Sequence, residues 1–167
     1  HGQSINLGCF RIEFIKTNHS ISDAAALAIY TPAGIIVHTG DFKIDYTPVF
    51  GDAIDLGRFA ELGKKGVLAL MCESTNVERE GYTPSERTVG RTLNHLFDEN
   101  SGHRIIVATF ASNVDRVQQI INCAYKYGKK VVVEGRSMVN TISTAAELGY
   151  IKIPENTLIG IEEMRNY

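Results

Sequence analysis

Hydrophobic and polar positions alternate in the first part of the chain, and this period-two pattern predicts strands. Residues 9–16 are rich in aromatic and β-branched side chains that alternate with charged ones. Two further apolar runs, residues 25–31 and 35–39, are separated by Pro32, Ala33 and Gly34, a sequence typical of a hairpin turn. We therefore predict an antiparallel sheet over about the first 45 residues.

From about residue 67 the pattern changes to strand, turn and helix, repeated three times. The expected strands are nearly continuous apolar runs, typical of strands covered on both faces, at residues 67–72, 104–109 and 130–134. Such an alternation predicts right-handed crossovers and a parallel sheet, so the predicted fold class is α/β. Residues 45–66 lie between the two patterns and are expected to be a linker with one short helix at 56–62.

The helices of the second part carry recognisable start and stop signals. Residues 83–86 (TPSE) are typical of a capping box with proline at the first helical position. The next helix is expected to begin at Ser112 or Asn113 and to close at Gly128. The last is expected from near Ser137 to Leu148.

Composition is that of an ordinary globular protein. The 167 residues are 44% hydrophobic and 22% charged, with a net charge of -2. This balance excludes a nucleic-acid binder that relies on bulk positive charge, but not one with a local groove. No apolar run reaches the ~20 residues of a membrane-spanning helix, and the first residues lack the pattern of a secretion signal. Three widely spaced cysteines, Cys9, Cys72 and Cys123, predict buried reduced thiols and a cytoplasmic location.

Polar residues gather where the expected parallel strands end. They are Ser74, Thr75 and Asn76, then Ser112 and Asn113, then Ser137. The carboxyl ends of parallel strands share one edge of a sheet, where such folds bind ligands. Glu73 and Arg136 lie beside these residues, and free N–H groups at helix starts favour an anion such as phosphate. The pattern predicts a phosphate-binding edge; the alternative is that these residues only cap helices.

Two residues of the strand-rich part are candidate metal ligands. His19 follows the first expected strand, and Asp41 follows the third. Imidazole and carboxylate together suit zinc or manganese, whereas the simpler interpretation is a solvated loop histidine and a turn aspartate. His38, one position from the end of its strand, is expected to be a packed or hydrogen-bonded core residue.

Several motifs resemble a known family. Residues 18–24 (NHSISDA) and 38–43 (HTGDFK) are similar to the third and fourth metal motifs of the metallo-β-lactamase superfamily. The motifs that follow narrow the resemblance to the ribonuclease J family of β-CASP nucleases; they are residues 73–76 (ESTN), 81–86 (GYTPSE), 108–113 (ATFASN) and 135–140 (GRSMVN). The resemblance runs almost end to end and corresponds to an interior part of such an enzyme.

The resemblance implies a fold and an activity. Residues 1–55 would be the C-terminal portion of a split metallo-β-lactamase domain, and residues 56–167 most of a β-CASP domain. The activity implied is metal-dependent hydrolysis of RNA, from the 5′ end and internally, in cytoplasmic rRNA processing and mRNA decay. The partners implied are single-stranded RNA and further copies of the enzyme, as a dimer or tetramer.

Site residues follow from the same resemblance. His19 and Asp41 would be metal ligands, with Asp41 bridging two zinc ions; manganese or magnesium are alternatives. Asp41 and Glu73 would be catalytic, Glu73 by supporting a later histidine. The residues expected to contact RNA are Ser74, Thr75, Ser112, Asn113, Arg136 and Ser137.

Two other classes of function stay open at this stage. One is a stand-alone α/β nucleotide-binding module without chemistry, which nucleotide binding unaffected by metal would favour. The other is a structural segment that mediates assembly, which oligomers formed without RNA or metal would favour. In the ribonuclease interpretation, this chain alone holds an incomplete metal site and is expected to be inactive.

Overall fold

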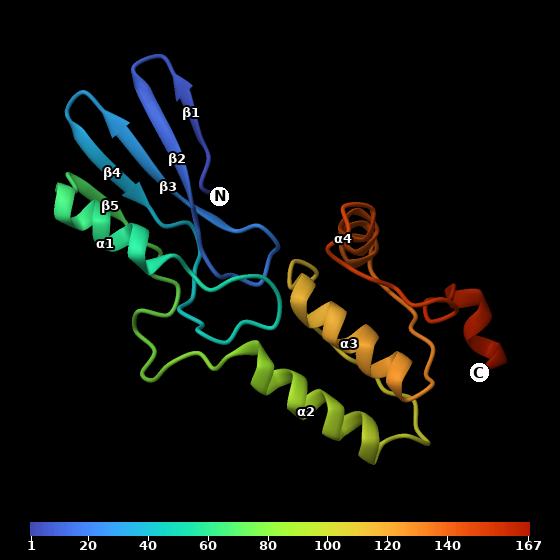
Figure 1. Ribbon diagram of the computed structural model, residues 1–167. Helices are drawn as coiled ribbons and strands as arrows, with labels where there is room; N and C mark the ends of the chain where they lie inside the picture. Colours follow the sequence, from blue (N-terminus) through green and yellow to red (C-terminus); the bar gives the residue numbers. More distant parts are fainter. The chain divides into compact units, whose positions relative to one another are not determined.

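The computed structural model describes residues 1–167 and forms two compact units (Figure 1). Unit 1 comprises residues 1–19 and 23–85, and unit 2 comprises residues 20–22 and 86–167. The main division of the chain lies between Ser85 and Glu86. The boundary predicted near residue 55 separates two domains of the family that the chain resembles, and it stays a prediction.

Unit 1 is built on a five-stranded sheet. Its strands lie side by side in chain order: β1 (Ser4–Leu7), β2 (Phe10–Lys16), β3 (Ala25–Thr31), β4 (Gly34–His38) and β5 (Ala69–Met71). The first four pair antiparallel, and β5 pairs parallel with β4. Since β2 and β4 both run antiparallel to β3, the carboxyl ends of β2, β4 and β5 lie at the same edge of the sheet.

One helix packs against this sheet. Helix α1 (Leu56–Lys65) begins after Asp55, whose Oδ1 accepts a hydrogen bond from the Arg58 amide at 2.9 Å, as an N-cap should. Leu62 is fully buried, and it shares a core with residues of β2, β3 and β4: Ile15, Ala26, Ala28 and Val37. This apolar contact keeps residues 56–71 in unit 1.

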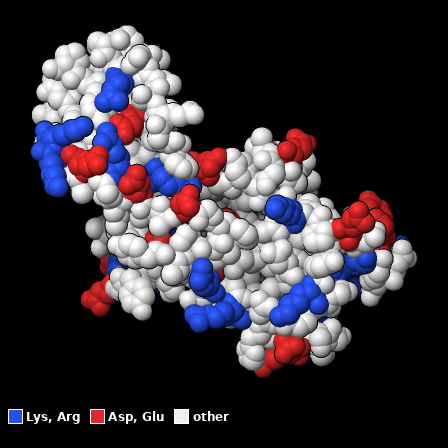
Figure 2. All heavy atoms as spheres, viewed as in Figure 1, with Lys and Arg blue, Asp and Glu red and all other residues white.

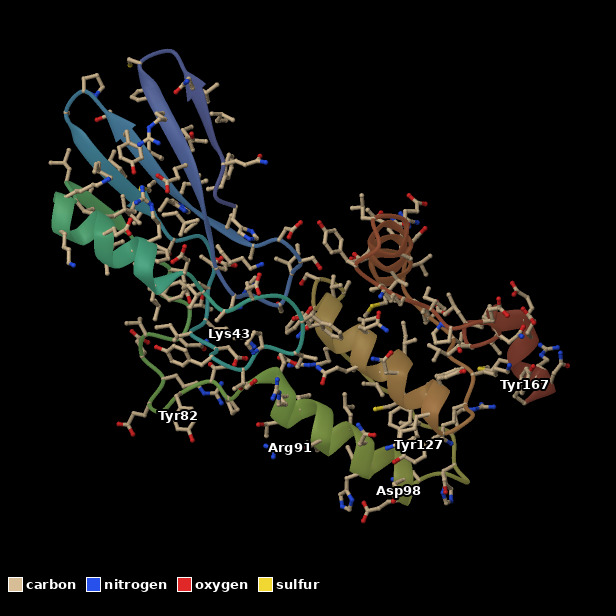
Figure 3. All side chains as sticks on the ribbon, in the orientation of Figure 1. Lys43, Tyr82, Arg91, Asp98, Tyr127 and Tyr167 are labelled. Atoms are coloured by element: carbon tan, nitrogen blue, oxygen red, sulfur yellow. The ribbon has the colours of Figure 1, made fainter.

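Unit 2 is a group of helices. They are α2 (Glu86–Glu99), α3 (Val114–Lys126), α4 (Arg136–Glu147) and the 3₁₀ helix η1 (Ile161–Asn166). Helix α3 lies between two apolar clusters: one face packs on Ile142 and Ala145 of α4, and the other on Leu93 and Phe97 of α2. Tyr127, labelled in Figure 3, follows α3 and donates a hydrogen bond from its hydroxyl to the Asn94 carbonyl of α2 at 3.2 Å.

Much of the predicted pattern is confirmed. The chain is a mixed α/β protein, and the first part is antiparallel with a hairpin at residues 31–34. Helix α1 lies where a short helix was expected, α3 is capped by Asn113 rather than Ser112, and Gly128 follows α3 with φ +64°. One strand, β1, was not predicted.

The prediction that three strands pair into one parallel sheet is wrong. Residues 69–71 form β5, which joins the first sheet, and Leu70 is 62% exposed rather than covered on both faces. Residues 104–109 form no strand, and residues 130–134 contribute one parallel bridge, between Val131 and Leu158. An apolar run predicts burial, but a strand also needs a neighbour aligned with its N–H and C=O groups, which the run itself does not specify.

Two smaller predictions are corrected. Helix α2 begins at Glu86, so Pro84 precedes it, and the Ser85 hydroxyl donates to the Thr47 carbonyl at 3.0 Å. Only Cys123 is a buried thiol, and its burial raises the pKa, while Cys9 and Cys72 are exposed because they lie in a turn and just past an edge strand.

Surface charge is mixed. On the face shown in Figure 2, Lys and Arg side chains alternate with Asp and Glu rather than forming one broad basic surface. This agrees with the net charge of -2. None of the helices has the length and apolar character needed to cross a membrane.

Candidate functional site

The shared edge of the sheet brings His19 and Asp41 together. His19 follows β2 and Asp41 follows β4, and the imidazole Nε2 lies 3.7 Å from the Asp41 carboxylate Oδ2. Both side chains are accessible, with exposed fractions of 35% and 71%. The pair therefore offers one nitrogen and one carboxylate to solvent at a single place.

The turn that carries Asp41 depends on Gly40. Its φ of +59° lies in the left-handed region, and its amide donates to Nδ1 of His38 at 3.1 Å. His38 is thus hydrogen-bonded, as predicted, but it is exposed rather than part of the core, because it ends β4 at the edge of the sheet.

Thr39 ties the end of β4 to the segment after β5. This buried residue donates its amide to the Met71 carbonyl at 3.0 Å, and its hydroxyl accepts from the Glu73 amide at 3.2 Å. Glu73 consequently lies at the same edge as the His19 and Asp41 pair. The sequence pattern did not single out Thr39, since a threonine that ends a strand is common.

Glu73 is held as a carboxylate. Its Oε2 accepts a hydrogen bond from the Thr75 amide at 2.8 Å. The amide and hydroxyl of Thr75 hold the pKa of the Glu73 carboxyl below its ordinary value, with a smaller electrostatic contribution from the neighbouring His19. An ionised carboxylate at this position can accept a hydrogen bond from a donor placed next to it.

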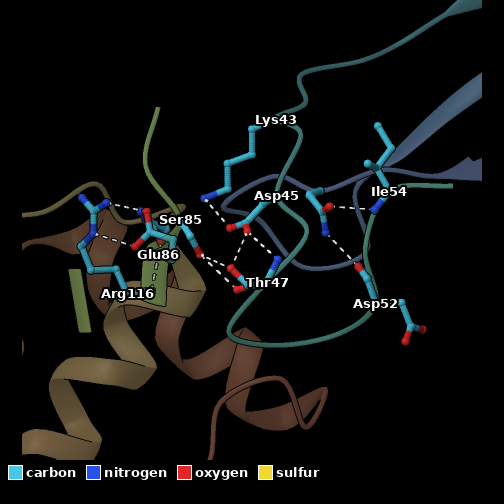
Figure 4. A network of polar contacts seen from close by, with 10 residues as sticks. Lys43, Asp45, Thr47, Asp52, Ile54, Ser85, Glu86 and Arg116 are labelled. Atoms are coloured by element: carbon cyan, nitrogen blue, oxygen red, sulfur yellow. Dashed lines mark hydrogen bonds and ion pairs between the residues drawn. The ribbon is translucent and has the colours of Figure 1, made fainter. Parts of the chain in front are cut away.

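A polar network fixes the loop between β4 and α1 (Figure 4). Asp45 is 5% exposed; its Oδ1 accepts from the Thr47 amide at 2.9 Å, and its Oδ2 lies 3.8 Å from Nζ of Lys43. Burial alone would raise the pKa of the Asp45 carboxyl, but hydrogen bonds from Thr47 and Ser85 and the charge of Lys43 outweigh it and lower the pKa. Sequence reasoning missed this network, because Lys43 and Asp45 look like ordinary surface residues of a loop.

The predicted RNA-binding residues lie in both units. Ser74 and Thr75 are exposed in unit 1, directly after Glu73. In unit 2, Arg136 and Ser137 are exposed residues in the first turn of α4, which begins after Gly135 and has no side-chain cap.

The second pair in unit 2 precedes α3. Ser112 is exposed, while Asn113 is 5% exposed and its Oδ1 accepts from the Arg116 amide at 3.0 Å. The structure thus uses the Asn113 oxygen as a helix cap, the simpler role considered from the sequence. Arg116 also forms an ion pair with Glu86 at 2.6 Å, which ties α3 to the start of α2.

The donor set for a metal is partial. No group of three or more His, Cys, Asp or Glu side chains is arranged to hold an ion. Catalytic zinc is held by three protein ligands, whereas His19 and Asp41 are two. The chemistry of these donors suits zinc or manganese, but they do not complete a site by themselves.

Comparison with known proteins shows that the sequence is similar to ribonuclease J. Residues 102–167 match the family model of the ribonuclease J beta-CASP domain. Over 98% of its length the chain is 48% identical to ribonuclease J of Synechocystis sp., covering 26% of that protein. It is 49% identical over 96% of its length to ribonuclease J of Mycobacterium tuberculosis, covering 28%. The chain spans about a quarter of the length of these curated relatives.

A solved structure shares the fold. A crystal structure of a protein of unknown function from Enterococcus faecalis V583 superposes with a TM-score of 0.67 at 20% identity, over 98% of this chain and 40% of that one. Residues 102–167 are thus similar to part of a beta-CASP domain. The chain as a whole is a relative of part of ribonuclease J, and the resemblance predicted from its motifs is confirmed.

Proposed function

We propose that this chain is the part of a metal-dependent ribonuclease that supplies His19 and Asp41 to the hydrolytic centre. The observation that carries the proposal is the approach of His19 Nε2 to Asp41 Oδ2, 3.7 Å, at the sheet edge where Glu73 also lies. Asp41 lies 22 positions after His19, and Glu73 lies 32 positions after Asp41, so it is the fold that brings the three residues to one edge of the sheet.

Each residue has a distinct role in this proposal. His19 would supply a directional imidazole nitrogen and Asp41 a carboxylate to zinc, or alternatively to manganese or magnesium. Two such metals, when bound, activate water and stabilise the leaving oxygen of a phosphodiester. Glu73, kept ionised by Thr75, would orient a catalytic imidazole by accepting its N–H.

RNA would be held by its backbone. The exposed hydroxyls of Ser74, Thr75, Ser112 and Ser137 and the Arg136 guanidinium are groups that bind phosphate and sugar oxygens without reading bases. Asn113, which is buried as the cap of α3, is not among the contacts we propose. Such recognition suits single-stranded RNA of any sequence. From the similarity to ribonuclease J, we extend the proposal to degradation from the 5′ end and internal cleavage, in cytoplasmic rRNA processing and mRNA decay, by a dimer or tetramer of a longer chain.

Hydrolysis of RNA by a full-length protein that contains this chain tests the proposal. His19→Ala and Asp41→Ala should each abolish hydrolysis of a labelled single strand while leaving RNA affinity nearly unchanged, because they remove metal ligands and no RNA contact. His95→Ala is a matched control, since His95 lies on the exposed surface of α2. This variant should hydrolyse RNA at the unaltered rate. Retained hydrolysis in either site variant would overturn the proposal.

A further inference from the structure

The residue before His19 is buried and fully engaged. Asn18 is 7% exposed, although it lies in the segment between β2 and β3 next to an accessible histidine. Burying a side-chain amide costs free energy unless the amide is hydrogen-bonded. The hydrogen bonds of Asn18 therefore show which parts of unit 1 its side chain joins.

Asn18 joins three segments of unit 1. Its Nδ2 donates to the Asp52 carbonyl at 2.8 Å, and its Oδ1 accepts from the Ile54 amide at 2.7 Å; both bonds are drawn in Figure 4. Its backbone carbonyl accepts from the Lys43 amide at 2.8 Å, within an isolated antiparallel bridge between Asn18 and Lys43.

These contacts lie next to both candidate ligands in the chain. Asn18 directly precedes His19, and Lys43 lies two residues after Asp41, so the bridge joins the two loops immediately beside the ligands. The side chain of Asn18 then anchors this bridge to residues 52–54, which lead into α1 and the core around Leu62. The loop after β2 is thereby tied to the packed part of unit 1.

We propose that Asn18 is a positioning residue that fixes His19 relative to Asp41. The importance of this positioning for catalysis rests on the proposed function. The positioning itself concerns only the geometry of His19 and Asp41. A side chain that can donate and accept at once is required, because one partner is a carbonyl and the other an amide. Ligand geometry in catalytic sites is set by such supporting contacts.

Nuclear magnetic resonance of the His19 imidazole in this chain tests the proposal. Spectra of the wild type and Asp41→Ala, at one pH, define the signal with and without the neighbouring carboxylate. In Asn18→Leu, which keeps the approximate shape but removes both hydrogen bonds, the His19 signal should move at least half of the way towards that of Asp41→Ala. Amide exchange of Ile54 and Lys43 should become about fivefold to tenfold faster.

Two controls separate positioning from general stability. Asn6→Leu alters an exposed asparagine of β1, and Leu62→Ala destabilises the core without touching either loop; the His19 signal should stay in place in both. If Asn18→Leu does not fold, Asn18→Asp keeps an acceptor for Ile54 but loses the donor to Asp52, and the signal should move part of the way. A folded Asn18 variant with an unmoved His19 signal would overturn the proposal.

A different experiment decides whether the proposed function is wrong. If a full-length protein that contains this chain hydrolyses RNA equally well without His19, the metal role is wrong. The effect of Asn18 on the geometry of the His19 and Asp41 pair would still be decided by the spectra.

Discussion

At the scale of single residues, Gly40 sets the direction of the turn that carries Asp41. Its φ is +59°, and a Cβ at this position would lie 3.2 Å from the Ala25 carbonyl oxygen. An L-residue in the left-handed region costs about 1–2 kcal/mol, and the close backbone oxygen cannot move aside as a flexible side chain could. Glycine is therefore required here by conformation and by space.

The substitution Gly40→Ala should lower the free energy of unfolding by about 1–2 kcal/mol. Gly63→Ala is the matched control, because Gly63 lies inside α1 with nothing within 4 Å of its Cβ position. There alanine should stabilise by up to about 1 kcal/mol through helix propensity. Urea denaturation of the two variants checks the opposite signs, and equal effects would contradict the account of Gly40.

Sequence reasoning finds exposed candidate ligands more readily than the buried residues whose hydrogen bonds fix the neighbouring loops. His19 and Asp41 were singled out because their chemistry is distinctive where strands end. In the sequence Asn18 is only one member of a motif, since its partners, Asp52 and Ile54, are 34 and 36 residues away. Nothing local distinguishes a buried amide with distant partners from a solvated one.

At the scale of elements, an ion pair joins the sheet to α1. Arg58 of α1 donates from Nε to Glu13 Oε1 at 2.5 Å and from Nη2 to Oε2 at 2.8 Å, and the Tyr30 hydroxyl also donates to Oε2 at 2.8 Å. Arg11 lies over the Tyr30 ring, 3.7 Å from its centroid. The hydrogen bond from Arg58 is the largest cause that lowers the pKa of Glu13 from its ordinary 4.5, with Tyr30 adding to it.

This lowered pKa makes the stability of unit 1 depend on pH. The carboxylate contributes its stability fully above the unfolded pKa, and the contribution is lost as the pH falls through the lower folded pKa. Glu13→Gln should remove about 2 kcal/mol near neutral pH and flatten the dependence below about pH 4.5. Denaturation at a series of pH values checks this.

The exposed partner of Arg58 provides the control for that experiment. Glu61 also pairs with Arg58, but its side chain is 63% exposed, so Glu61→Gln should change stability by less than about 1 kcal/mol. An equal loss in both variants, or an unchanged acid slope in Glu13→Gln, would contradict the role of the Glu13 pair.

Elements with strong local signals were predictable, and those defined by distant partners were not. The strand at residues 25–31 was predicted with its observed bounds because a short apolar run followed by a hairpin turn defines it locally. The run at residues 104–109 has an equally strong apolar signal but no neighbouring strand. Pairing is a property of two segments, so a pattern in one of them is not sufficient.

At the scale of the whole molecule, the residues proposed to hold RNA are distributed along most of the chain. Arg136→Ala should weaken binding of single-stranded RNA more than Ser74→Ala, which removes one neutral hydrogen bond worth about 1 kcal/mol. Arg136→Ala should also reduce the dependence of affinity on salt by about one released counterion, without a change in base preference. Affinities and melting temperatures of both variants, measured over a salt series, check this prediction; lowered stability with unchanged RNA affinity would show that Arg136 only supports α4.

The resemblance to one family could be predicted at this scale because the motifs extend over nearly the whole chain. A match of 48% identity over 98% of the chain confirms it. The complete ligand set could not be predicted from the same motifs, since the two candidate ligands, His19 and Asp41, are two donors and catalytic zinc takes three.

The central claim is that His19 and Asp41 are ligands of a metal site that this chain completes only in part. The most direct test is the zinc and manganese content of a full-length protein that contains the chain, compared with its Asp41→Ala variant and with the 167-residue chain alone. We predict bound metal in the full-length protein, loss of metal in Asp41→Ala, and weak or no binding by the 167-residue chain. Unchanged metal content in Asp41→Ala, or tight stoichiometric binding by the chain alone, would contradict the claim.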